Sequence, residues 1–209
     1  MRVGHEDGRD AFLDGLDTFL DDVEGLSDED LMAPSRCLGW TRGDLIVHVH
    51  LGLQEMLHGI VTPSDAQPDT DAAEYWTGDP PGDQDRLAGM RFVRLVGAAY
   101  QKPTGAVTHL KPTAEAIAGA VRRLHDHNVR FQGHVMTSGD FLATWAVELA
   151  VHQLDLRSEA PAQTALKLAR RTVEALNMPN KQNWDDERVV LIGTRRISDE
   201  TGTLVRFVG

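Results

Sequence analysis

Residues 139–156, GDFLATWAVELAVHQLDL, form a long apolar stretch that also carries two side chains able to bind a metal ion. In a helix, Glu148 and His152 lie on the same face because they are four residues apart, so both could reach one ion. A helix this apolar is expected in the protein core, where an unpaired carboxylate costs roughly several kcal/mol. The two side chains therefore need partners there, which are either a shared metal ion or simply each other, joined by a hydrogen bond.

Composition narrows the class of protein. At 209 residues and 41% hydrophobic content, the chain is long enough for one well-packed domain and an appendage. The net charge of -11 disfavours a phosphate-binding surface, so no nucleic-acid partner is expected. The N-terminal residues MRVGHEDGRD lack an apolar signal region, and no apolar run reaches the ~20 residues of a membrane span. We therefore expect a cytoplasmic protein with no membrane partner.

Helical periodicity recurs along most of the chain. Apolar residues at helical spacing, with capping or breaking residues at the ends, predict helices at Asp7 to Leu26, Arg42 to Ile60, Asp85 to Tyr100, Lys111 to His127 and Gly139 to Leu156. Thr41 and Asp44 resemble a capping box at the start of the second of these helices. Between the second and third lies a loop rich in proline, aspartate and glycine. Its two aromatic residues, Tyr75 and Trp76, are expected either to anchor it or to line a pocket mouth.

The C-terminal part of the chain has a different pattern. Pro161 to Leu176 predicts an amphipathic helix, and the β-branched runs of Arg188 to Val208, separated by the turn sequence DETG, predict a β-hairpin. The predicted fold is therefore mainly α. It consists of a four-helix-bundle domain over residues 1–158 and a small tail, residues 159–209, of one helix and a β-hairpin packed on the bundle.

A third metal ligand is available on the Arg42 to Ile60 helix. His48 lies at the edge of its core face, whereas His50, two residues away, points elsewhere. Helix bundles commonly build metal sites from inward-facing residues of different helices. His48, Glu148 and His152 would supply two nitrogens and one carboxylate, as in catalytic zinc sites that keep one position open. Cys37 is the single cysteine, so a Cys-rich zinc site is excluded. Gly52, one turn beyond His48, is expected to leave room for an ion or ligand.

Other polar residues are weaker candidates for the same site. His134, just before the late apolar helix, is a candidate fourth ligand or acid–base group, with a solvated loop histidine as the alternative. Arg195 and Arg196, in the predicted hairpin, could bind a carboxylate or a thiol cofactor, or could be ordinary exposed arginines. Asp155 could accept a hydrogen bond from a ligand imidazole, or could instead cap a helix or form a surface salt bridge. Cys37 is expected to be either a small buried residue or a nucleophile near the site mouth.

Several of these residues occur together in a known family. The metal-binding domain of mycothiol-dependent maleylpyruvate isomerases, of the DinB-like four-helix superfamily, is similar to the segments Gly39-Trp40-Thr41, Asp44-Leu45-Ile46-Val47-His48, and Glu148-Leu149-Ala150-Val151-His152 with Asp155. The ending Trp184-Asp185-Asp186-Glu187, followed by a short β tail, resembles smaller members of the same group. The resemblance implies that His48, Glu148 and His152 bind a divalent ion, most plausibly zinc. It also implies a low-molecular-weight thiol such as mycothiol as cosubstrate. The tail after Pro161 is expected to be too short for the C-terminal domain of the isomerase proper.

Two classes of function follow. The first is a metal-dependent thiol transferase or isomerase that acts on a small electrophilic molecule. The second is a non-catalytic module, for ligand binding or stress response, that keeps the bundle and the metal site. Either could be a monomer or a homodimer. Metal content and a thiol-conjugation assay would distinguish the two classes.

Overall fold

Helix α6 (Ser138–Leu156) is the central element of the computed structural model, which describes residues 1–77, 83–176 and 183–198. Along α6, all of which is described, only Trp145 and Glu148 are not fully buried. The Thr137 hydroxyl caps its first turn by accepting a hydrogen bond from the Asp140 backbone N–H. The prediction of a buried helix over residues 139–156 is confirmed, and its one partly open face is the face that carries Glu148.

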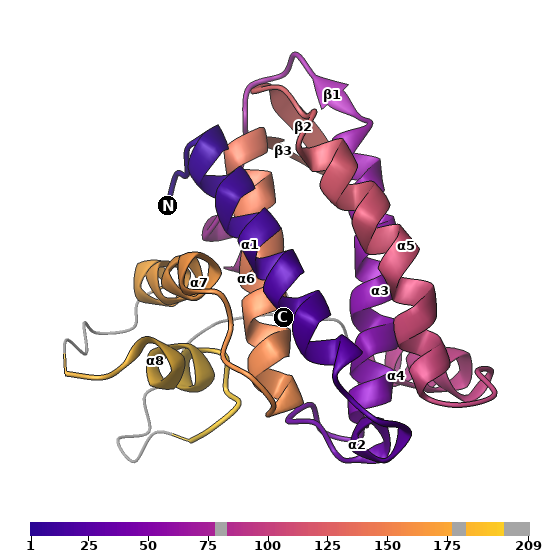
Figure 1. Cartoon of the computed structure of the whole chain (residues 1–209). Helices are drawn as coiled ribbons and strands as arrows, with labels where there is room; N and C mark the ends of the chain where they lie inside the picture. Colours follow the sequence, from indigo (N-terminus) through magenta and orange to yellow (C-terminus); the bar gives the residue numbers. More distant parts are fainter. Residues whose placement is uncertain (78–82, 177–182, 199–209) are drawn as a thin grey trace.

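Three further long helices complete a four-helix bundle with α6. They are α1 (His5–Glu24), α3 (Arg42–Ile60) and α5 (Thr104–Val121), and Figure 1 shows α1 beside α6 and α3 beside α5. The short α2 (Asp28–Met32) connects α1 to α3, and α4 (Asp83–Ala98) packs on α3. The predicted mainly α bundle is confirmed. None of the helices within the described residues is long and apolar enough to cross a bilayer.

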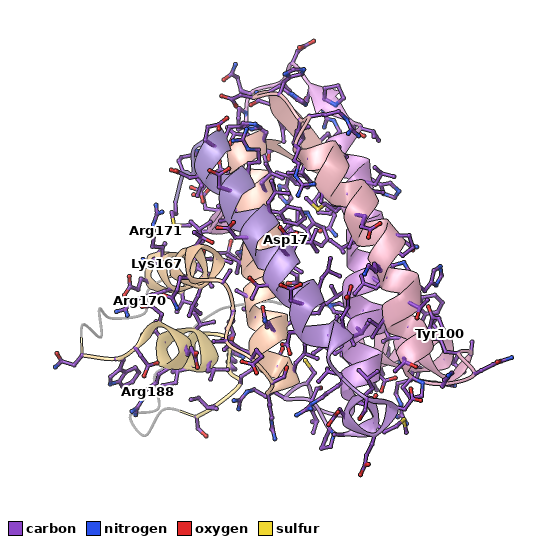
Figure 2. All side chains as sticks on the ribbon, viewed as in Figure 1. Asp17, Tyr100, Lys167, Arg170, Arg171 and Arg188 are labelled. Atoms are coloured by element: carbon purple, nitrogen blue, oxygen red, sulfur yellow. The ribbon has the colours of Figure 1, made fainter. Side chains whose placement is uncertain are left out.

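Helices α1 and α3 form as their sequence patterns predict. On α1, Phe12, Leu16 and Phe19 are fully buried, while Asp17 lies on the outer side of the helix (Figure 2). Helix α3 has the predicted bounds, and both hydrogen bonds of the capping box between Thr41 and Asp44 are present. Because this box fixes where α3 begins, it also fixes which of its side chains face α6.

Helix α5 corrects one predicted boundary. It begins at Thr104, about two turns before Lys111, and therefore contains Pro112. A proline inside a helix loses one backbone hydrogen bond and costs about 3 kcal/mol. A continuous buried stripe on both sides of the proline outweighs this cost; it consists of Ala106, Leu110, Ala114, Ile117 and Val121. The helix ends at Val121, so His125 and His127 follow it instead of forming its last turn.

A small antiparallel sheet lies at one end of the bundle and was not predicted. Its strands are β1 (Pro63–Ser64), β2 (Asn128–Phe131) and β3 (His134–Thr137), in the order β1-β2-β3. The two-residue turn between β2 and β3, Gln132 and Gly133, has φ values of 47° and 85°. Two successive positive φ values match the twist of a tight hairpin. Beside the sheet, Trp76 of the 3-10 helix η1 (Glu74–Thr77) is buried, so the aromatic pair anchors the loop.

The C-terminal part is helical as far as it is described. Helix α7 (Gln163–Ala175) is confirmed and packs on α1 and α6, and α8 (Asp186–Gly193) packs on α7. The hairpin prediction is wrong for residues 188–193, and its remainder from residue 199 lies outside the described residues. The Asp185 carboxylate caps α8 by accepting from the Arg188 backbone N–H, and four consecutive apolar residues after it are buried. Capping and burial together outweigh the β propensity of this run.

Close contact between α1 and α6 leads to a stability prediction. A Cβ atom added at Gly8 would lie 2.4 Å from the backbone oxygen of Gly139. Backbone atoms cannot move aside cheaply, so Gly8→Ala is expected to lower the free energy of unfolding by about 2 kcal/mol or more. Gly89 on α4 is the matched control, because no atom lies within 4 Å of its added Cβ. Gly89→Ala should stabilise by about 0.5–1 kcal/mol. Urea denaturation of both variants checks this, and equal effects would contradict the close packing.

Candidate metal centre

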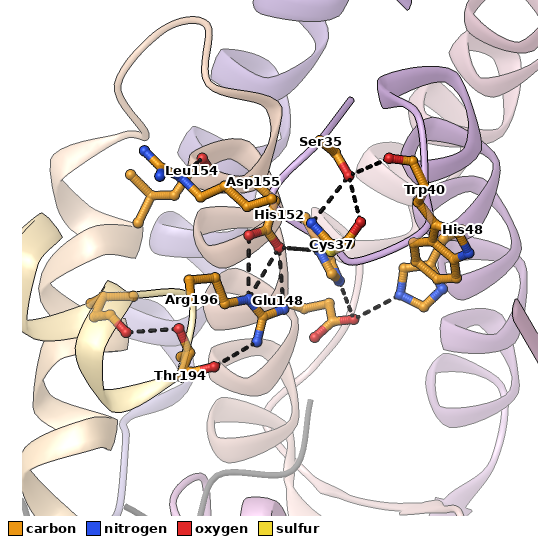
Figure 3. A network of polar contacts seen from close by, with 12 residues as sticks. Ser35, Cys37, Trp40, His48, Glu148, His152, Leu154, Asp155, Thr194 and Arg196 are labelled. Carbon is orange, nitrogen blue, oxygen red and sulfur yellow. Dashed lines mark hydrogen bonds and ion pairs between the residues drawn. The ribbon is translucent and has the colours of Figure 1, made fainter. Parts of the chain in front are cut away.

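Three side chains from α3 and α6 converge on one point. His48 Nε2 lies 3.4 Å, and His152 Nε2 lies 3.0 Å, from the same oxygen of Glu148, Oε1. These three atoms all lie within 4.8 Å of one another, and Figure 3 shows Glu148 between the two imidazoles. The structure therefore brings together the three residues that the sequence singled out as metal ligands.

The three side chains differ in their access to solvent. His152 is only 3% exposed, whereas Glu148 is 23% and His48 is 34% exposed. The Trp40 ring covers one side of His48, with 5.1 Å between ring centroids. Trp40 follows Gly39, whose φ of +83° favours glycine and turns the chain sharply before α3. The centre is thus buried on the side of α6 and partly open beside α3.

A buried carboxylate orients His152. Asp155 Oδ2 lies 3.1 Å from His152 Nδ1, and Asp155 is fully buried. An acceptor on Nδ1 places the proton there and leaves the Nε2 lone pair free for a metal ion, an arrangement common around metal-binding histidines. The prediction that Asp155 accepts a hydrogen bond from His152 is confirmed.

Asp155 is in turn held by the C-terminal part of the chain. Arg196 donates to both of its oxygens, with Nε to Oδ1 at 3.2 Å and Nη2 to Oδ2 at 3.1 Å. The thiol of Cys37 also donates to Oδ2, at 3.2 Å. Arg196, a candidate for binding a cofactor, is thus committed to Asp155, and Arg195 is exposed with a left-handed backbone (φ 61°). No local sequence signal points to the contact between Arg196 and Asp155, because 41 residues separate them.

Charge coupling within the centre is strong. Burial opposes ionisation of Glu148, but the positive charge of His152 and hydrogen bonds from both histidines hold the pKa of Glu148 well below its ordinary value. Burial likewise opposes a charged His152, but Glu148 and Asp155 raise the pKa of His152 well above its ordinary value. Without an ion, this coupling favours a proton on Nε2 of His152, facing the Glu148 carboxylate, and that proton must leave before a metal ion can bind there.

The donor set fits a zinc ion. Two imidazole nitrogens and one carboxylate oxygen are ligands that zinc takes in catalytic sites, and the Asp155 contact leaves the correct nitrogen of His152 available. A second cluster, Cys37 with His152 and Asp155, shares His152 and belongs to the same network.

Protons and zinc compete for Nε2 of His152, so zinc affinity is expected to depend on pH. Nε2 must lose its proton before it can bind zinc, so zinc affinity should fall about tenfold per pH unit below the raised pKa of His152. In the ion-free protein, the stabilisation from the raised His152 pKa is complete below pH 6.5 and is lost as the pH rises through the folded-state value. The stabilisation from the lowered Glu148 pKa is present above pH 4.5 and is lost as the pH falls through the folded-state pKa of Glu148. Competition titrations with a chromophoric chelator over a pH series measure the affinity, and a pH-independent affinity would contradict the coupling.

The remaining candidates lie away from the three ligands. His134 is in β3, where its Nδ1 lies 3.3 Å from Asp69 Oδ1, and its side chain is 50% exposed. Ten residues of helix separate the start of α6 from Glu148, which corresponds to about 15 Å. Gly52 does not leave room for an ion, because its added Cβ would lie 3.2 Å from the Trp145 ring. The glycine instead accommodates this indole between α3 and α6.

Comparisons with known proteins agree with the fold and the motifs. The family model described as the mycothiol maleylpyruvate isomerase N-terminal domain matches residues 12–157. The crystal structure of the mycothiol-dependent maleylpyruvate isomerase is similar, with a TM-score of 0.67, 13% identity, and coverage of 98% of this chain and 96% of that one. A histidine-to-alanine mutant of that isomerase gives a TM-score of 0.65 at 14% identity, with the same coverage. No curated protein sequence matches the chain.

These structures confirm the DinB-like bundle as the fold class and correct one expectation. The tail after Pro161 was expected to be too short for the C-terminal domain of the isomerase. The chain nevertheless covers 96% of the solved isomerase, so the two chains have nearly the same extent.

Proposed function

Because the chain belongs to the family of the mycothiol maleylpyruvate isomerase N-terminal domain, we propose that it is a metal-dependent enzyme of thiol chemistry. It would use a low-molecular-weight thiol such as mycothiol, and would either isomerise a small electrophile or transfer the thiol to it. His48, Glu148 and His152 would hold a divalent ion, most plausibly zinc. The observation that carries the proposal is the convergence of their three ligand atoms within 4.8 Å.

A bound divalent ion would lower the pKa of a coordinated thiol, so that thiolate is available near neutral pH. In an isomerisation, the thiolate sulfur adds to one carbon of a cis double bond, the remaining single bond rotates, and the C–S bond breaks to restore the double bond in the trans form. In a transfer, the C–S bond persists: after addition the neighbouring carbon takes up a proton, and in a displacement the leaving group of the electrophile departs with the electron pair of its bond to carbon. The chemistry belongs to the thiol and the electrophile, and the protein contributes orientation and burial.

The residues of the centre have distinct parts in this proposal. Asp155 accepts from Nδ1 of His152 and would thereby leave Nε2 available to a bound ion. Trp40 covers His48 and restricts water on that side of the centre. Arg196 neutralises Asp155 and keeps its carboxylate in place. We also propose that residues 1–158 form the metal-binding domain and residues 159–209 a tail packed on it, which contributes Arg196 to the centre.

Metal content and turnover test the proposal together. Protein purified without a metal-affinity tag and incubated with zinc should carry one ion per chain by elemental analysis. Mycothiol and a panel of electrophiles should then give conjugates or isomers, and a chelator should abolish turnover until zinc is restored. If the zinc-treated protein carries no metal, or if turnover persists in chelator, the proposal fails. Ligand binding without any turnover would favour the non-catalytic module instead.

A further inference from the structure

A hollow lies next to the metal centre, at the end of the bundle where α3 begins. Its volume is about 450 Å³, and it is bordered by the loop before α3, by α4 and by the C-terminal end of α6. Trp40 is among the residues that line this hollow, and its ring packs on His48. Cys37 also lines it and contacts Asp155. The hollow is therefore next to the metal centre through Trp40 and Cys37, while the three proposed metal ligands are not among its lining residues.

Three arginines from three different elements surround the hollow. Arg36 comes from the loop before α3, Arg94 from α4, and Arg157 from the C-terminal cap of α6. Within the described part of the chain, no carboxylate lies within the 4.0 Å ion-pair distance of any of them. The single acidic residue in the lining, Asp44, already accepts the capping hydrogen bonds of Thr41. In a chain with a net charge of -11, this concentration of unpaired positive charge is a local exception.

The surrounding structure holds the guanidinium group of Arg36 and the main chain of Arg157. Arg36 Nε donates to the carbonyl of Leu154 at 2.9 Å, which holds the plane of its guanidinium group. Arg157 adopts a left-handed backbone (φ 58°), and its carbonyl accepts from Arg42 Nη2 at 3.4 Å. A planar guanidinium that is held in place matches the two oxygens of a carboxylate better than a mobile one does, because less side-chain entropy is lost on binding.

Apolar side chains complete the lining. Met32 is 63% exposed and Leu38 is 89% exposed, although both are large hydrophobic residues. Trp40 is also among the lining residues. The hollow thus combines positive charge and apolar surface.

We propose that this hollow binds an organic carboxylate, with the carboxylate on the arginines and an apolar body against Met32, Leu38 and Trp40. Inorganic phosphate shares the anionic chemistry but lacks the apolar body, so the apolar residues distinguish the two. One part of this proposal rests on the proposed function, namely that the bound carboxylate is a group of the electrophile that reacts at the metal centre. Binding itself does not, because it requires neither metal nor turnover.

Calorimetric titration tests the site with defined probes. Benzoate, cinnamate and 4-phenylbutyrate are titrated into the full chain, in chelator and again with zinc, beside the neutral amide benzamide and inorganic phosphate. At least one carboxylate should bind saturably and more tightly than benzamide or phosphate. The double variant Arg94→Gln/Arg157→Gln should weaken that binding about tenfold or more, as expected for the loss of charge-assisted hydrogen bonds. Leu38→Ser should weaken it by a smaller factor.

Arg171→Gln is the matched control, because Arg171 is an exposed arginine on α7, well separated from α4 in the view of Figure 2. It should leave carboxylate binding unchanged. Failure of all three carboxylates to bind the wild type would overturn the proposal, as would equal binding by the double variant. The proposal would also be overturned if phosphate bound as tightly as the carboxylates and Leu38→Ser had no effect. The site would then recognise the negative charge of the ligand and not its apolar body. If the carboxylate binds but the chain shows no turnover, the proposed function fails and this site stands.

Discussion

Replacing His48 with alanine is expected to remove zinc from the protein while leaving its fold intact. In the proposed metal site His48 supplies one of three ligand atoms. Losing the outer partner of a ligand typically weakens metal binding about 10- to 100-fold, so losing a ligand itself should weaken zinc binding by at least about 100-fold. Its side chain is 34% exposed, so the truncation opens no closed cavity and should cost little stability. Elemental analysis after zinc incubation and gel filtration measures the retained ion, and circular dichroism checks the fold.

His134→Ala is the matched control for this prediction. His134 is also a partly exposed histidine beside a carboxylate, Asp69, but it lies in β3 away from the three ligands. This variant should retain one zinc ion per chain. Loss of zinc from both variants would contradict the assigned ligand set, and retention of zinc by His48→Ala would remove His48 from it.

The bundle and the convergence of His48, Glu148 and His152 could be predicted because their signals are local. Spacing of four places Glu148 and His152 on one helix face, and the Thr41 capping box sets the start of α3 and with it the direction of His48. Apolar periodicity likewise locates α1 and α6. Each of these features depends on residues within about one or two turns of one another, which is the range that sequence patterns describe.

Features that depend on contacts distant in sequence could not be predicted. Pro112 lies inside α5 because a buried stripe on both sides of it packs into the bundle. Residues 188–193 carry β-branched side chains but form a helix, since α7 offers them a surface for burial. The ion pair between Arg196 and Asp155 joins residues 41 positions apart. Gly52 is needed because the Trp145 ring packs against it, and Trp145 is distant in sequence. In each case tertiary packing outweighs a local preference.

Asp155→Asn is expected to destabilise the whole protein as well as weaken the metal centre. The Asp155 carboxylate is fully buried and is the ion-pair partner of Arg196, which is itself only 11% exposed. Asparagine would leave that buried charge uncompensated, which costs about 3–5 kcal/mol and corresponds to a Tm about 6–20 °C lower for a chain of this size. Because His152 Nδ1 would also lose its carboxylate acceptor, zinc affinity should fall about 10- to 100-fold.

A double-mutant cycle separates the two effects of this substitution. Arg196→Gln removes the charge that Asp155 balances, so the combined variant Asp155→Asn/Arg196→Gln should be less destabilised than the sum of the single variants. Zinc affinity should remain low in the combined variant, since neither change restores the carboxylate that orients His152. Thermal unfolding and zinc titration of all four proteins measure both quantities. If Asp155→Asn lowers the Tm by less than about 2 °C, the buried charge of Arg196 does not need this carboxylate as its partner. Additive free energies would mean that the two side chains act independently, and the tail would then have no energetic connection to the metal centre through this pair.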